Sequence, residues 1–143
     1  IASCLVGSEM CIRDSYYTTT KGILEKVKTH AGDVDFEVQP ELLSLFSNRD
    51  FGRYAGEKGE MNVCFISNND ITGGNSGSAM FNARGELLGL AFDGNWEAMS
   101  SDILYEPKMQ RCIGVDVRYI LFMIEKYGKA GDLIRELKIV SGK

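Results

Sequence analysis

The sequence is poor in several features that particular classes of protein require. It has two prolines and one histidine in 143 residues, and no apolar run reaches the ~18 residues of a membrane-spanning helix. Its net charge is −4 and no basic cluster stands out, which argues against nucleic acid and anionic membranes as partners. Glycine, in contrast, is plentiful: sixteen of the 143 residues are glycine, about 11% against the usual ~7%. We therefore expect one globular domain, or a piece of a larger protein, with many turns.

Cysteines are too few for a disulfide-stapled scaffold. The segment 1–15 (IASCLVGSEMCIRDS) lacks the charged start and apolar middle of a secretory signal, and it resembles the translated adaptor sequence found at the ends of environmental sequencing reads. We interpret it as a foreign, adaptor-derived segment, with an ordinary N-terminal segment as the alternative. Cys64 and Cys112 remain, without C-x-x-C spacing, and are expected to be buried free thiols. No metal and no cofactor are predicted.

The apolar pattern predicts a mainly β core that begins near residue 61. Residues 16–60 carry a Thr run, many charges and only a short apolar helix candidate at 41–46, which indicates a connecting arm. Three short apolar segments follow, bounded by turn residues, and predict antiparallel strands at 61–67, 78–82 and 86–92.

The period changes after Pro107. Apolar residues at positions 117, 120, 121 and 124 recur at helical spacing from a cap at Asp116 to a stop at Gly128. This pattern predicts a terminal amphipathic helix packed on the sheet, with one more short helical stretch at 132–137. Residues 61–143 are therefore expected to form the domain that follows the connecting arm.

Chemistry is indicated between the first two predicted strands, where DITGGNSGS (70–78) places Ser76 among glycines. A tight turn there lets the backbone N–H groups of Gly74 and Ser76 converge on one point, which can hold the oxyanion of an acyl-transfer intermediate. Ser76 is then the candidate nucleophile. A plain Gly-Ser hairpin turn is the alternative, and spacing alone leaves the two open. A phosphate loop is disfavoured because GxxxxGK followed by Ser or Thr is absent.

Longer strings carry a family resemblance. TGGNSGS with the strand N-x-x-G-E-L-L-G-L resembles the nucleophile region of chymotrypsin-fold serine peptidases, including glutamyl endopeptidases. More narrowly, GLAFDGNWEAMSSDI (89–103) and QRCIGVDVRYILFMIEKYG (110–128) resemble the bacterial dipeptidyl peptidase 7 and 11 family, on the dipeptidyl peptidase 7 side. The likeness runs from about residue 16 to 140. Ala79 departs from it, because Pro usually follows GNSGS, and altered rigidity is the expected consequence.

The resemblance implies a fold. Members have a chymotrypsin-like double β-barrel with a helical domain inserted in it. This chain is then expected to be the C-terminal part: a connecting arm from the helical domain (16–60), then the second β-barrel with its C-terminal α-helix (61–143). A periplasmic or secreted location is implied in the same way, and a homodimer is an expectation for the full-length protein.

The resemblance also assigns roles by position. Ser76 is implied as the nucleophile, with the N–H groups of Gly74 and Ser76 as the oxyanion hole. Asp93 matches the carboxylate that binds the free α-ammonium of a substrate, although a turn Asp is its alternative. Gly94 stands where acidic-specific members carry Arg, which implies a hydrophobic or uncharged second residue in the substrate. Phe92 and Trp96 either line that pocket or belong to the core.

A serine nucleophile needs a base, and the sequence does not supply one in a matching setting. His30, in KTHAGD, is interpreted as a solvent-exposed turn residue, and the triad Asp is likewise expected upstream. The chain alone is therefore predicted to be inactive. The predicted function is that of a serine exopeptidase that releases dipeptides from the free N-terminus of oligopeptides. A glutamyl-type endopeptidase and a non-catalytic peptide-binding barrel are the alternatives.

Overall fold

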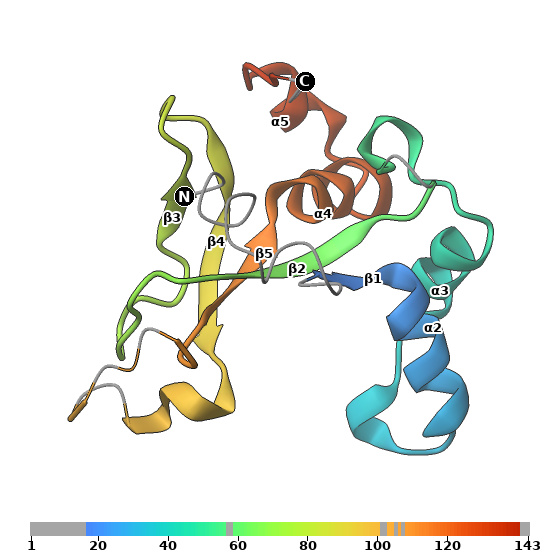
Figure 1. Ribbon diagram of the computed structural model, residues 1–143. Helices are drawn as coiled ribbons and strands as arrows, with labels where there is room; N and C mark the ends of the chain where they lie inside the picture. The colour runs from blue at the N-terminus through green and yellow to red at the C-terminus, as the bar shows by residue number, and fades with distance from the viewer. Residues whose placement is uncertain (1–16, 57–58, 101–102, 105, 107, 141–143) are drawn as a thin grey trace. The chain divides into compact units, whose positions relative to one another are not determined.

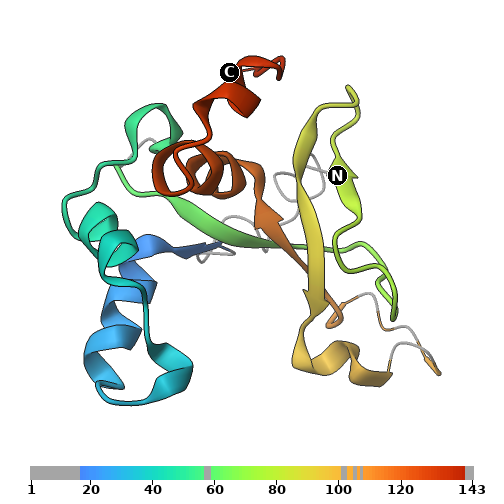
Figure 2. The ribbon, with the colours of Figure 1, turned by 180° about the vertical axis from the view of Figure 1, so that it is seen from behind.

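The computed structural model describes residues 17–56, 59–100, 103–104, 106 and 108–140. They fall into two compact units (Figures 1 and 2). Of the described residues, a β unit comprises Tyr17 and 64–117, and a helical unit comprises 18–63 together with 118–140. The terminal helix, apart from its first residue, falls in the same unit as residues 18–63. The segment 1–15, interpreted as adaptor-derived, lies outside the described residues.

The strands form one sheet in the order β1-β2-β5-β4-β3. Three neighbouring pairs, β2 with β5, β5 with β4 and β4 with β3, are antiparallel. A mainly antiparallel sheet with helices is thus confirmed. The strands are β1 (Tyr17–Thr19), β2 (Asn62–Ser67), β3 (Ala79–Phe81), β4 (Leu87–Gly94) and β5 (Cys112–Asp116). β2, β3 and β4 match the three predicted strands, whereas β1 and β5 were not predicted.

Two glycines allow the β unit to build its core. Phe65 on β2 lies opposite Gly114 on β5, and its ring covers both Gly114 and Gly89 of β4. A Cβ at Gly114 would come within 2.7 Å of the Phe65 ring and of the Met80 sulfur. Only hydrogen fits there, so the ring packs directly on the backbone. The buried cluster around it consists of Phe65, Met80, Ala91 and Cys112.

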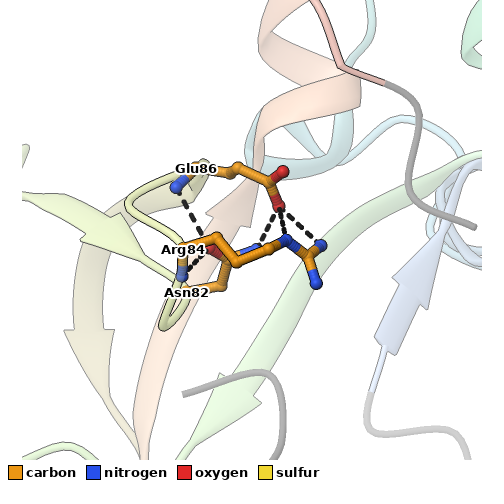
Figure 3. A network of polar contacts seen from close by, with 3 residues as sticks. All are labelled: Asn82, Arg84 and Glu86. Carbon is orange, nitrogen blue, oxygen red and sulfur yellow. Dashed lines mark hydrogen bonds and ion pairs between the residues drawn. The ribbon is translucent and has the colours of Figure 1, made fainter.

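The hairpin that joins β3 to β4 is closed by a polar network (Figure 3). The Asn82 side-chain oxygen accepts from the backbone N–H groups of Arg84 at 2.9 Å and Glu86 at 3.0 Å. The Arg84 guanidinium donates to the Glu86 carboxylate at 2.7 Å. This contact, with that from Asn82, lowers the pKa of Glu86. Gly85 occupies the left-handed φ of 74° that the turn requires. The turn therefore fixes where β4 begins.

The helical unit packs its elements around aromatic side chains. The Phe122 ring lies 6.0 Å from those of Phe46 and Phe51, measured between centroids, and all three side chains are at most 2% exposed. The terminal helix thus buries Phe122 against residues of the predicted arm. The elements are α2 (Thr20–Thr29), η2 (Val34–Phe36), α3 (Pro40–Ser47), η3 (Gly52–Tyr54), α4 (Val117–Phe122), η5 (Met123–Tyr127, a π-helical turn) and α5 (Gly131–Arg135).

Gly128 caps the end of η5, which continues α4, and so ends the helix at the predicted residue. Across the described ranges, no helix is both long enough and apolar enough to cross a membrane.

Ion pairs and a buried phenol tie η5 to the segment 50–54. The Tyr54 hydroxyl donates to the Glu125 carboxylate, which also accepts from Arg53 at 3.1 Å. The Lys126 ammonium lies 2.8 Å from the Asp50 carboxylate. Burial, with the Glu125 contact, raises the pKa of Tyr54, and the Tyr54 hydrogen bond lowers the pKa of Glu125. These contacts join residues about 70 positions apart and hold the helical unit together.

Candidate active site

The glycines around Ser76 fold the chain into two consecutive turns. The Asn75 N–H donates to the Thr72 carbonyl, and the Ser78 N–H donates to the Asn75 carbonyl at 2.9 Å. Gly74 and Gly77 stand at the third position of these turns with φ of 94° and 87°, the left-handed conformation that a type II turn demands there. A Cβ at either glycine would meet nothing within 4 Å. Backbone conformation, rather than lack of space, therefore explains the glycines.

Ser76 is exposed at the second position of the second turn. Its hydroxyl donates to the Phe92 carbonyl of β4 at 3.3 Å, a long bond at the surface. Among the described residues, no acceptor is found for the amide of Gly74 or of Ser76, whereas the Gly77 amide donates to the Ala91 carbonyl at 2.7 Å. The last bond fixes the loop to β4. The Ser76 hydroxyl is thus exposed, and the amides of Gly74 and Ser76 have no acceptor among the described residues.

A register shift in β4 brings two consecutive side chains to the same site. Ala91 pairs with Gly114 of β5, and Asp93 pairs with the adjacent residue Ile113. Two residues of β4 therefore advance against one of β5, and Phe92 is the extra residue in the strand. The alternation of buried and exposed residues along β4 breaks at this bulge, and both Phe92 and Asp93 are exposed. Bulges often redirect a side chain beside a functional site.

The loop and the bulge line one cavity of about 250 Å³. This volume is below the roughly 300–1,000 Å³ of sites for drug-sized ligands, which suits part of a peptide rather than a whole one. Four residues predicted for the site, Ser76, Phe92, Asp93 and Gly94, line it together, whereas Gly74 does not. The other lining residues are Ile71, Thr72, Gly73, Asn95, Ala98 and Met99.

The predicted binding residues differ in how available they are. Asp93 is exposed, and one carboxylate oxygen accepts from the Gly94 amide at 2.7 Å, as a turn Asp would. Phe92 is 58% exposed and Trp96 is 81% exposed. The alternative that both belong to the core is therefore wrong, and Trp96 does not line this cavity either.

Asn95 is a site residue that the sequence analysis missed. Its side-chain amide donates to the Met109 carbonyl and to the Glu97 carboxylate, and its oxygen accepts from the Arg111 amide at 2.8 Å. These bonds connect the end of β4 to a segment some 15 residues later. In the sequence Asn95 is only an Asn that follows a Gly. Its role could not be predicted from that, because its partners Met109 and Arg111 are distant in sequence.

His30, Cys64 and Cys112, the other residues with reactive side chains, do not line this cavity. His30 ends α2, and its ring stacks on Phe36 at a centroid distance of 4.2 Å while Nδ1 contacts the Thr29 hydroxyl at 2.9 Å. The turn position is confirmed, but the ring is half-buried rather than solvent-exposed. Cys112 is buried and free, as predicted, and burial raises the pKa of its thiol. Cys64 is free and only half-buried.

Known proteins match this chain over almost all of its length. The peptidase S46 model matches residues 8–139, beginning inside the segment interpreted as adaptor-derived. The chain is 57% identical over 128 residues to dipeptidyl-peptidase 7 of Porphyromonas endodontalis, covering 90% of this chain and 15% of that protein. It is 45% identical over 132 residues to the Asp/Glu-specific dipeptidyl-peptidase of Porphyromonas gingivalis, covering 90% of this chain and 18% of the relative.

A solved structure is similar as well. The crystal structure of Porphyromonas endodontalis DPP11 in complex with the dipeptide Arg-Glu superposes with a TM-score of 0.79 at 43% sequence identity. The match covers 84% of this chain and 17% of the DPP11 chain. The chain thus spans less than a fifth of the length of these relatives. Since the family's model covers all but the ends of the sequence, the chain belongs to the peptidase S46 family.

Proposed function

We propose that this chain is the C-terminal part of a serine exopeptidase that releases dipeptides from the N-terminus of oligopeptides. The observation that carries the proposal is the shared cavity, which Ser76, Asp93 and Gly94 line together. Its relatives support the reaction class, because they are named dipeptidyl-peptidases. The similar DPP11 structure was solved with a dipeptide bound.

Ser76 would act by acyl transfer. Its Oγ attacks the carbonyl carbon of the second residue of the substrate, and its proton passes to a histidine base. The negative charge that forms on the carbonyl oxygen is held by the Gly74 and Ser76 amides. The C–N bond then breaks, the leaving amine takes the proton from the histidine, and water hydrolyses the acyl-enzyme to free the dipeptide.

Asp93 would measure the length of the product. A carboxylate binds an α-ammonium strongly through a charge-assisted hydrogen bond, and only the first residue of a peptide carries that charge. An endopeptidase has no use for this contact. One Asp93 oxygen is occupied by the Gly94 amide, so the other is the one assigned to the substrate.

Gly94 would set the second residue of the substrate. Glycine places no charge in the cavity, and the exposed ring of Phe92 beside it is apolar. A hydrophobic or uncharged side chain therefore fits better than Asp or Glu, which would lose its hydration without gaining a partner.

The base and the triad Asp would come from a part of the longer protein outside this chain. His30 supports this assignment, because its ring is held by Thr29 and Phe36. In this proposal the β unit contributes to the second barrel of a chymotrypsin-like double barrel. The full-length protein would be periplasmic or secreted and would form a homodimer.

The proposal is tested in a chimera in which this chain replaces the matching segment of Porphyromonas endodontalis dipeptidyl-peptidase 7. We expect the chimera to cleave a Phe-Met reporter faster than a Leu-Asp reporter, and to lose cleavage when the α-amine of the Phe-Met reporter is acetylated. Asp93→Asn should lower kcat/KM for the free-amine reporter by about tenfold to a hundredfold, since a charge-assisted bond is lost.

Asp35→Asn is the matched control, because Asp35 is exposed on η2 and belongs to the other unit. Faster cleavage of the Leu-Asp reporter would refute the assignment of Gly94. Undiminished cleavage of the acetylated reporter would show an endopeptidase instead.

A further inference from the structure

We infer that Ala98 is a second specificity-determining residue of the cavity, because its methyl group blocks the space that a side chain at position 94 would enter. The inference rests on the proposed function, in which Gly94 faces the second side chain of the substrate. It goes further by assigning the uncharged character of the cavity to a pair of residues rather than to the glycine alone.

The contact between the two positions is very close. A Cβ built on Gly94 would lie 2.9 Å from the Ala98 Cβ, closer than a Cβ approaches the atoms of a non-adjacent residue in proteins. Its next neighbours, Ile71 Cγ2 at 3.7 Å and the Arg111 carbonyl at 3.9 Å, are at ordinary van der Waals distance. Gly94 does not adopt a positive φ. Among the described residues, the Ala98 methyl is therefore the tight obstacle to a side chain at this position.

Ala98 is also held in place from behind. It is 9% exposed in η4 (Trp96–Ser100), and its amide donates to the Asn95 carbonyl at 2.9 Å. Asn95 in turn is fixed to Met109 and Arg111 by its side chain, and its amide donates to the Arg111 carbonyl at 2.9 Å. The turn that carries Ala98 is thus tied to a segment beyond it and resists moving away from Gly94.

A change of specificity should therefore need two substitutions. Gly94→Arg alone adds a positive charge, but its Cβ collides with Ala98 and displaces the end of β4. Ala98→Gly removes the obstacle without touching the charge. The double variant is expected to accept an acidic second residue better than Gly94→Arg does.

The experiment compares four versions of the chimera: the parent, Gly94→Arg, Ala98→Gly and the double variant. We expect Gly94→Arg to lose cleavage of the Phe-Met reporter and to gain little with Leu-Asp. The double variant should cleave Leu-Asp at least about tenfold faster than Gly94→Arg, since overpacking in a tight site costs about that factor. Equal Leu-Asp cleavage by Gly94→Arg and the double variant would overturn the inference.

A second measurement does not depend on catalysis. Gly94→Ala adds only the offending Cβ, and it should lower the melting temperature of the chimera measurably, but by less than half as much when Ala98→Gly is present. Equal shifts in both backgrounds would also overturn the inference. Gly22→Ala, on α2 with nothing within 4 Å of its Cβ, is the control that should not lower it. If the parent chimera cleaves no dipeptide reporter, the proposed function fails, while this cycle still decides the contact.

Discussion

The two units of this chain differ in how they use their apolar side chains. The helical unit buries large aromatic rings: Phe46, Phe51, Tyr54 and Phe122 are all at most 3% exposed. The β unit has a smaller core around Phe65 and leaves more of its large apolar residues in solvent than the helical unit, where Val34, Leu133 and Leu137 are more than half exposed. In the β unit the residues that are more than half exposed are Phe92, Trp96, Met99, Ile103, Leu104 and Met109, of which Phe92 and Met99 line the cavity.

The difference in burial indicates that the two units contribute differently to folding stability and to ligand binding. An aromatic cluster in a closed core contributes free energy of folding, whereas exposed apolar side chains beside a cavity contribute little until something covers them. The glycine turns and the bulge of β4 lie in the β unit as well. We therefore expect substitutions in the helical unit to change stability first, and substitutions at the cavity to change activity first.

The largest expected effect on stability is that of Phe122→Ala. Removing a fully buried phenyl ring costs about 3–5 kcal/mol, because the lost contacts leave a cavity among Phe46 and Phe51. In the chimera, hydrogen–deuterium exchange of peptides from residues 40–54 should rise strongly. Ser76→Ala, at an exposed position, serves as the comparison and should leave that exchange unchanged. Similar exchange in both variants would remove the distinction between the units.

A smaller effect distinguishes two carboxylates that both have a lowered pKa. Glu125 joins Tyr54 and Arg53 across the helical unit, whereas Glu86 joins residues two and four positions away in one hairpin. Because the pKa of Glu125 is below its usual value of 4.5, its ionised form stabilises the fold above that pH, and this contribution is lost as pH falls through the lowered pKa.

Glu125→Gln should therefore lower the melting temperature of the chimera near neutral pH, and the difference from the parent should shrink below about pH 4.5. Glu86→Gln should change it less at every pH, since its partners are local. A larger loss for Glu86→Gln at neutral pH would contradict the view that the long-range contacts hold the helical unit.

Local pattern was sufficient to predict part of this fold. The apolar runs predicted β2, β3 and β4 within about two residues, and the spacing from Val117 to Gly128 predicted the helix that α4 and η5 form. β5 was missed because CIGVD is short and contains a glycine whose role depends on Phe65 of another strand. The packing of the last helix was missed for the same reason, since its partner Phe46 is 76 positions away along the sequence.

The site shows the same limit. TGGNSGS and FDG were recognised as strings, and the bond from Gly77 to Ala91 is what brings them together. The bulge at Phe92 and the anchors of Asn95 depend on pairing between distant segments, and the contact of Ala98 with Gly94, four positions apart, depends on the 3₁₀ turn η4. Sequence periodicity cannot predict such contacts, so Asn95 and Ala98 were identified as cavity residues only from the structure.

The most direct test of the central claim, that Ser76 is the nucleophile, is labelling with a fluorophosphonate probe followed by intact-mass measurement and peptide mapping. The chimera should take up one equivalent of probe on Ser76, whereas its Ser76→Ala variant and the 143-residue chain alone should take up none. A chimera that cleaves the Phe-Met reporter but carries the label on another residue, or cleaves it undiminished after Ser76→Ala, would contradict the account.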